Sequence, residues 1–227
     1  MNEILSQWDF AVILLQIIAI DLLLGGDNAV VIAMACRKLP AHLRTKAIVI
    51  GTLGAIIARV ALLAVAIYLL SLPWLKIVGA LLLLWIGVKL VANEEEESDI
   101  SSSSSLWRTA VTITVADVIM SLDNVLAVAA AGKGHLLLVA LGVLISIPII
   151  VAGSKLVLAI LTRFSSVVLL GGALIGWIAG SMMITDPTLV QLFPNSPNYL
   201  HFVAGAIGAA LVLLEGWRRN YRSGTPE

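Results

Sequence analysis

The sequence predicts an all-α, polytopic membrane protein: seven transmembrane helices, arranged as two inverted three-helix repeats plus a seventh helix. Three observations lead to this fold class. The composition is too apolar for a soluble domain. Seven apolar segments are each long enough to cross a bilayer, and one acidic motif occurs twice, 96 residues apart.

The composition limits the class of protein. Of the 227 residues, 60% are hydrophobic and 12% are charged, and the mean hydropathy is +1.04, whereas soluble domains are about half apolar and about a quarter charged. A formal net charge of zero gives no general attraction to nucleic acid. The single cysteine, Cys36, excludes an intrachain disulfide and a multi-cysteine metal site. Residues 1–10 lack the positive charges of a signal peptide, so we expect the first apolar segment to be retained as a span.

Seven apolar segments meet the length of about 20 residues that a helix needs to cross a hydrocarbon core of about 30 Å. They cover residues 9–36, 46–71, 73–91, 107–131, 135–160, 164–184 and 199–217. The acidic and serine-rich stretch NEEEESDISSSSS cannot bury a core and predicts a disordered linker. The expected organisation is a three-span repeat at 1–92, a linker at 93–106, an inverted repeat at 107–185, and a loop, seventh span and basic tail at 186–227.

The distribution of Lys and Arg predicts the orientation, because these residues mark the cytoplasmic side of a membrane protein. With the N-terminus outside, the outer side carries only Lys76 and Lys133. The inner side then carries eleven: Arg37, Lys38, Arg44, Lys46, Lys89, Arg108, Lys155, Arg163, Arg218, Arg219 and Arg222. We therefore expect a multi-pass protein of the cell membrane with its C-terminus and its acidic linker in the cytoplasm.

The repeated motif places four carboxylates inside predicted membrane helices. DLLLGGDNAVVIAMA begins at Asp21, and DVIMSLDNVLAVAAA begins at Asp117. Both read Asp, five residues, Asp-Asn and then a run of small and branched apolar residues. A carboxylate at the centre of a membrane helix costs about 2.5–3.5 kcal/mol on insertion scales, and such residues mark ion pathways. Two matched pairs of them favour a cation pathway.

The repeat extends weakly beyond the motif. Gly51 has a counterpart in Gly142, and the Gly79 and Trp85 pair recurs at Gly171 and Trp177 with the same spacing. A unit of three spans is odd, so its second copy enters the membrane from the opposite side. Inverted repeats of this kind are typical of secondary transporters, which bind their ions near the midplane at the repeat interface.

Helical geometry predicts which motif residues face the same way. Residues seven apart lie about 20° from each other around a helix, so Asp21 and Asn28 share a face, as do Asp117 and Asn124. Asp27 and Asp123 point elsewhere unless the helix is irregular. Gly25-Gly26 is a natural place for a break that re-aims Asp27 and frees backbone carbonyls. Since the two spans are antiparallel, Asp21 is expected at the level of Asp123, and Asp27 at the level of Asp117. The motifs therefore predict either one composite site or two stacked levels on the pseudo-twofold axis.

The side chains indicate the kind of ion. Carboxylates, carboxamides and a hydroxyl are hard oxygen donors that suit Mg²⁺, Ca²⁺ or Mn²⁺, and the absence of His and Cys from the motifs argues against Zn²⁺ and Cu⁺. Four carboxylates so close together must hold some protons when no ion is present, which suggests exchange of a cation for protons. Arg59, the one cation deep in a span, is expected to pair with one Asp. Met120 is expected to fill the core rather than to lend a softer sulfur ligand, which would favour Mn²⁺. The predicted metal-binding residues are Asp21, Asp27, Asn28, Asp117, Ser121, Asp123 and Asn124.

At DLLLGGDNAVVIA and ADVIMSLDNVLAVAA the sequence resembles the TerC family of integral membrane proteins, and the resemblance covers the first six spans. It implies a seven-span fold related to the LysE-type transporters, and several bacterial members of the family are implicated in manganese efflux. The family's acidic motif residues fall here on Asp21, Asp27, Asn28, Asp117, Asp123 and Asn124. Mn²⁺ is thus what the resemblance implies as the transported substrate, with no resident cofactor.

Other classes remain open at this point. The same motifs fit an exporter of Ca²⁺ or Mg²⁺, or a non-transporting scaffold, insertion partner or metal-stress-resistance partner in the membrane. An intramembrane aspartyl protease also uses two membrane Asp, but its Gly-x-Gly-Asp motif is replaced here by Leu24-Gly25-Gly26-Asp27. The sequence contains no soluble catalytic domain and no nucleotide-binding motif, so we expect a transporter driven by ion gradients and not an enzyme.

Overall fold

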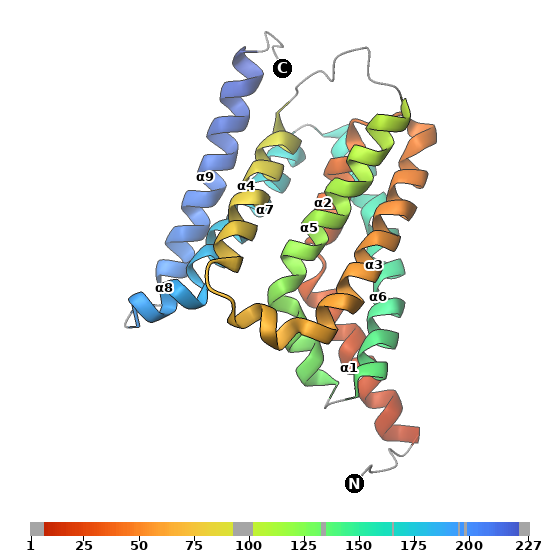
Figure 1. Cartoon of the computed structure of the whole chain (residues 1–227). Coiled ribbons are helices and arrows are strands. Elements are labelled where there is room, and N and C mark those ends of the chain that lie inside the picture. Colours follow the sequence, from red (N-terminus) through yellow and green to blue (C-terminus); the bar gives the residue numbers. More distant parts are fainter. Residues whose placement is uncertain are drawn as a thin grey trace.

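The computed structural model describes residues 7–92, 102–132, 135–164, 166–194, 196–197 and 199–222. Within these ranges the chain forms nine helices and no strand, which confirms the all-α class (Figure 1). The helices are α1 (Gln7–Leu24), α2 (Asn28–Arg37), α3 (Ala41–Ser71), α4 (Leu75–Val91), α5 (Ser102–Ala131), α6 (Leu136–Arg163), α7 (Ser166–Ile184), α8 (Pro187–Leu192) and α9 (Tyr199–Arg222). The linker was predicted at residues 93–106. Residues 93–101 lie outside the described residues, whereas residues 102–106 belong to α5, so the predicted linker is too long at its C-terminal end because the helix of the fourth span already begins at Ser102.

Five of the described helices are individually long and apolar enough to cross a membrane, namely α3, α5, α6, α7 and α9. α1 and α2 together give a sixth candidate, because Phe10–Leu24 and Asn28–Arg37 form one span bent by 51°. α4 has 17 residues, which is shorter than the usual span of about 20. The described helices therefore give five or six candidate spans, and the predicted count of seven depends on α4.

The bend between α1 and α2 falls at Gly25-Gly26, as the sequence predicts. The Gly25 N–H donates to the Asp21 carbonyl at 2.8 Å, and a Cβ on Gly25 would lie 2.8 Å from the same oxygen. Only glycine fits this close approach. The corresponding residues of the second motif are Ser121 and Leu122, and there α5 continues without a break. One copy of the motif is thus on a broken helix and the other on a continuous one.

The helices pack in two groups. α3 lies along α5, and α6 lies along α1 and α2, while α7 packs against α9 and α4. Figure 1 shows α4, α7 and α9 on one side, α1, α3 and α6 on the other, and the two termini at opposite ends of the bundle. α7 and α9 approach closely because small residues face each other, and a Cβ on Gly180 would clash with the Ala204 backbone. Small residues at helix interfaces are typical of membrane proteins.

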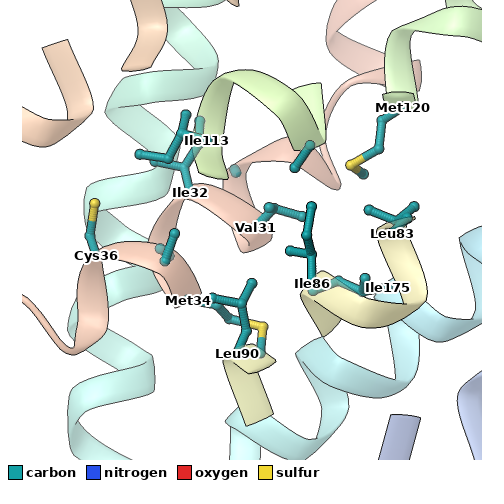
Figure 2. Packing of buried hydrophobic residues seen from close by; sticks show 14 of the residues in the cluster. Val31, Ile32, Met34, Cys36, Leu83, Ile86, Leu90, Ile113, Met120 and Ile175 are labelled. Carbon is teal, nitrogen blue, oxygen red and sulfur yellow. The ribbon is translucent and has the colours of Figure 1, made fainter. Parts of the chain in front are cut away.

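Two apolar clusters fill the bundle. The larger is built around α2, α4 and α7 and also takes in residues of α3, α5, α6 and α9; Figure 2 shows Met34, Ile86, Leu90 and Ile175 within it. The smaller joins α1, α3, α5 and α6. Each of these four helices also contains a buried polar residue close to the point where the two clusters meet: Asp21, Arg59, Asp117 and Ser146. These four residues form a polar layer near the boundary between the two apolar clusters.

The segment after α7, expected to be a loop, contains the short helix α8. Asp186 is the N-cap of α8, and its carboxylate accepts N–H groups from Thr188 (2.9 Å), Trp74 (3.2 Å) and Lys76 (3.1 Å). One buried side chain thus satisfies the first turns of both α8 and α4. Burial favours its protonated form, but the donated hydrogen bonds outweigh that effect and hold the pKa of Asp186 below its usual value.

Candidate cation site

Arg59 is the centre of the polar layer. Its guanidinium bridges the two copies of the motif: one nitrogen lies 2.8 and 3.1 Å from the carboxylate oxygens of Asp21, and the other lies 2.7 Å from Asp117. All three side chains are buried, with 1%, 2% and 8% of Asp21, Arg59 and Asp117 exposed. The predicted pairing of Arg59 with one Asp is confirmed and extended, because it pairs with two.

Further donors complete the coordination of these carboxylates. Asn28 donates to Asp117 at 2.8 Å, and the Ser121 hydroxyl donates to the other oxygen of Asp117 at 3.3 Å. The Ser146 hydroxyl, from α6, donates to Asp21. Hydrogen bonds to buried charges are needed to offset their lost hydration. We call the set Asp21, Asn28, Arg59, Asp117, Ser121 and Ser146 the Arg59 cluster.

Asp27 lies outside this cluster, in the break between α1 and α2. One of its carboxylate oxygens is buried and has no hydrogen-bond partner in the described structure. The residue lines a separate open pocket of about 220 Å³. The other lining residues come from α5, α7 and α9, with one at the end of α7: Met120, Asn124, Trp177, Ile178, Ser181, Met182, Thr185 and His201. We call this the Asp27 pocket.

Asn124 connects the two regions. It lines the Asp27 pocket and also a small cavity of about 10 Å³ beside Asp21, Arg59 and Ser121, which has room for about one water. Its side-chain amide donates to the Leu24 carbonyl at 3.1 Å. The helix break was expected to free backbone carbonyls. One such carbonyl, that of Leu24 just before the break in the first motif, accepts this hydrogen bond from Asn124 of the second motif.

The structure divides the predicted metal-binding residues into three sets. Asp21, Asn28, Asp117 and Ser121 meet in the Arg59 cluster. Asp27 and Asn124 line the neighbouring pocket, and the side chain of Asp123 lies outside the described residues. The prediction placed Asp21 with Asp123 and Asp27 with Asp117, whereas in the structure Asp21 and Asp117 share one guanidinium. Residue spacing within one helix could not predict this contact, because Arg59 belongs to a different helix, α3.

The described side chains contain no group of three or more His, Cys, Asp or Glu arranged to hold a metal ion. Two of the carboxylates, Asp21 and Asp117, are instead paired with the Arg59 guanidinium that lies between them. The donors present are oxygens of carboxylates, amides and hydroxyls, the kind that Mg²⁺, Ca²⁺ and Mn²⁺ prefer.

Two residues of this region were not among the predicted site residues. Ser146 was not singled out, although a hydroxyl in an apolar span is a signal for a buried hydrogen bond. His201 lies near the start of the seventh predicted span, outside the motifs, and it lines the Asp27 pocket. Neither residue lies in the repeated motif, and the site residues were predicted from that motif alone.

Fold and site together define an integral membrane protein with a buried layer of charged side chains. The chain belongs to the TerC family of integral membrane proteins, which it matches over residues 6–223. It is 44% identical over 208 residues to the uncharacterized membrane protein YjbE of Bacillus subtilis (strain 168), covering 92% of this chain and 95% of that one. It is also 30% identical over 128 residues to YceF of the same organism, covering 52% and 50% of the two chains. No solved structure matches the chain significantly.

Proposed function

We propose that this protein is a divalent cation transporter that exports Mn²⁺ by alternating access, with the ion bound near the bilayer midplane between the two motifs. The observation that carries the proposal is Asp27, which lines an open pocket beside the Arg59 cluster and has one buried carboxylate oxygen with no hydrogen-bond partner in the described structure. A buried carboxylate oxygen with no donor is costly unless it binds something.

Charge balance supports a divalent ion. Among the side chains that the structure describes, Asp21, Asp27 and Asp117 carry three negative charges when ionised, and Arg59 carries one positive charge. The remaining charge of −2 in this described set matches one divalent cation or two protons, which suits an exchange of the two, and Asp123 would add one further negative charge. Arg59 itself then acts as a tethered cation, holding two of the carboxylates whenever the metal is elsewhere.

The packing supports alternating access. Under the 96-residue repeat, the broken α1–α2 span corresponds to α5, α3 to α6, and α4 to α7. The packing of α3 on α5 then corresponds to that of α6 on α1 and α2. A pseudo-twofold axis relating two three-span repeats explains this exchange. In this account α4 completes a seven-span fold with an external N-terminus, a cytoplasmic C-terminus and a place in the cell membrane.

The donors of the Asp27 pocket favour manganese over lighter ions. Met120 and Met182 line the pocket together with Asp27 and Asn124, so thioether sulfur stands beside hard oxygen donors. Sulfur suits transition metals, whereas Ca²⁺ and Mg²⁺ take oxygen ligands. Met120 was expected only to fill the core, and we now propose it as a selectivity residue.

The proposal is tested by measuring the Mn²⁺ content of cells that express the wild-type protein or Asp27→Asn in Mn²⁺-rich medium. We expect wild-type cells to retain less Mn²⁺ than Asp27→Asn cells, which should match cells without the protein. Glu215→Gln, a change at the surface of α9, is the control and should export normally. Full export by Asp27→Asn would contradict a metal role for this carboxylate and favour the scaffold alternative.

A further inference from the structure

A second pocket lies at the end of the bundle that carries the C-terminus, between the last turns of α2 and α4 and the first turns of α5. Its volume is about 80 Å³, more than the roughly 30 Å³ that one water takes in the liquid. Its lining residues are Ala35, Lys38, Leu39, Trp85, Ile86, Lys89, Leu90, Ser105, Arg108, Thr109 and Thr112. We call it the basic pocket. It shares no residue with the Arg59 cluster or the Asp27 pocket.

Among the described residues, three cations and no carboxylate line this pocket. Lys38 is held by carbonyl groups, donating to Lys89 at 3.3 Å and also to Ala92. Lys89 lies over the Trp85 ring, 5.4 Å from its centre. Across the described part of the chain, neither Lys89 nor Arg108 has an acidic partner. Like charges gathered around one cavity repel each other unless an anion lies between them.

The rest of the lining is amphipathic. Ser105, Thr109 and Thr112 bring hydroxyl groups, while Ile86 and Leu90 form an apolar wall. Trp85 is 54% exposed and continues into the exposed apolar surface of α4, which contains Val78, Leu81 and Leu82. A surface of this kind in a membrane protein faces lipid chains, so the pocket opens sideways toward the bilayer and not only toward water.

We propose that the basic pocket binds the phosphate headgroup of an anionic phospholipid. Basic pockets between membrane helices recognise such headgroups, and anionic lipids are enriched in the cytoplasmic leaflet, the side on which Lys38, Lys89 and Arg108 are expected. The headgroup phosphate lies among the three cations and the hydroxyls, and the acyl chains lie along the exposed face of α4. The bound lipid joins α2, α4 and α5 at the end of the repeat interface.

The test is native mass spectrometry of the purified full-length protein with phosphatidylglycerol or phosphatidylcholine. The variant is the double change Lys89→Gln/Arg108→Gln. The control is Arg218→Gln/Arg219→Gln, which removes the same charge from α9 at the same end of the bundle. We expect wild type and control to bind phosphatidylglycerol in preference to phosphatidylcholine. The double variant should bind phosphatidylglycerol about 30-fold more weakly, from the attraction that each juxtamembrane cation contributes.

Two further arms identify the source of the anion. Inorganic phosphate should neither displace the lipid nor raise the thermal midpoint of the lipid-free protein. Changing Glu94–Glu97 to Gln should leave lipid binding unchanged, whereas a large gain would mean that this acidic segment is the occupant. Equal binding by wild type and double variant, or displacement by inorganic phosphate, would overturn the proposal. A size-exclusion profile like that of wild type shows that the double variant is folded.

Discussion

Replacing Arg59 by Gln tests whether Arg59 stabilises the fold by pairing with Asp21 and Asp117, and whether a metal ion can replace its lost positive charge. The substitution removes the positive charge that contacts Asp21 and Asp117 at 2.7–3.1 Å and leaves two buried carboxylates without a cation. Removing one partner of a buried ion pair costs about 3–5 kcal/mol. For a chain of this size such a loss lowers the thermal midpoint by roughly 6–20 °C.

The same reasoning predicts a rescue. Two carboxylates freed of Arg59 match a divalent cation, and a ligand that binds only the folded state at 100 times its Kd returns about 2.7 kcal/mol. The assay is thermal denaturation of the purified protein in detergent, with and without Mn²⁺. Mn²⁺ should raise the midpoint of Arg59→Gln well above any rise in wild type. The exposed Arg163→Gln should behave as wild type. An unchanged midpoint in Arg59→Gln, or an equal response of both proteins to Mn²⁺, would refute the reasoning.

The remaining predictions concern the packing and the loops. Gly180→Ala should destabilise the protein by about 1–3 kcal/mol, because its Cβ meets the Ala204 backbone; Gly153→Ala, which meets nothing within 4 Å, should be neutral or stabilising in the same melting assay. Because the pKa of Asp186 is lower in the folded protein, its carboxylate stabilises the fold at pH values above its unfolded-state pKa of about 3.9. This stabilisation is lost as the pH falls through the folded-state pKa. The midpoint difference between wild type and Asp186→Asn should therefore be constant near neutral pH and disappear once the pH is below the lowered folded-state pKa of Asp186, and a pH-independent difference would contradict the capping role.

The sequence was sufficient for the features that local chemistry determines. Apolar length located the helices, and Gly25-Gly26 located the break. Asp21 and Asn28 do meet in the Arg59 cluster, but they lie on two helices separated by a 51° bend, so the seven-residue spacing within one helix is not what brings them together. A lone Arg in an apolar span had to find an acidic partner, and it did.

Contacts between different helices could not be predicted from the sequence. Arg59 bridges two motif copies because α3 packs along α5 near α1, and that packing depends on the whole bundle. Ser146 and His201 belong to no repeat, so nothing in their own segments linked them to the carboxylates. Asp186 had a visible signal, an Asp-Pro at a helix start, but its second role, on α4, required the fold.

The most direct test of the account is Mn²⁺ uptake into everted vesicles carrying the protein, with and without an imposed pH gradient. The wild type is compared with Asp27→Asn, which alters the carboxylate that does not hold Arg59, and with Glu215→Gln. The account predicts gradient-dependent uptake by wild type and Glu215→Gln, and uptake at least tenfold slower in Asp27→Asn at equal protein insertion. Uptake by Asp27→Asn at the wild-type rate, or no uptake by correctly inserted wild type, would contradict a carboxylate-based manganese exchanger.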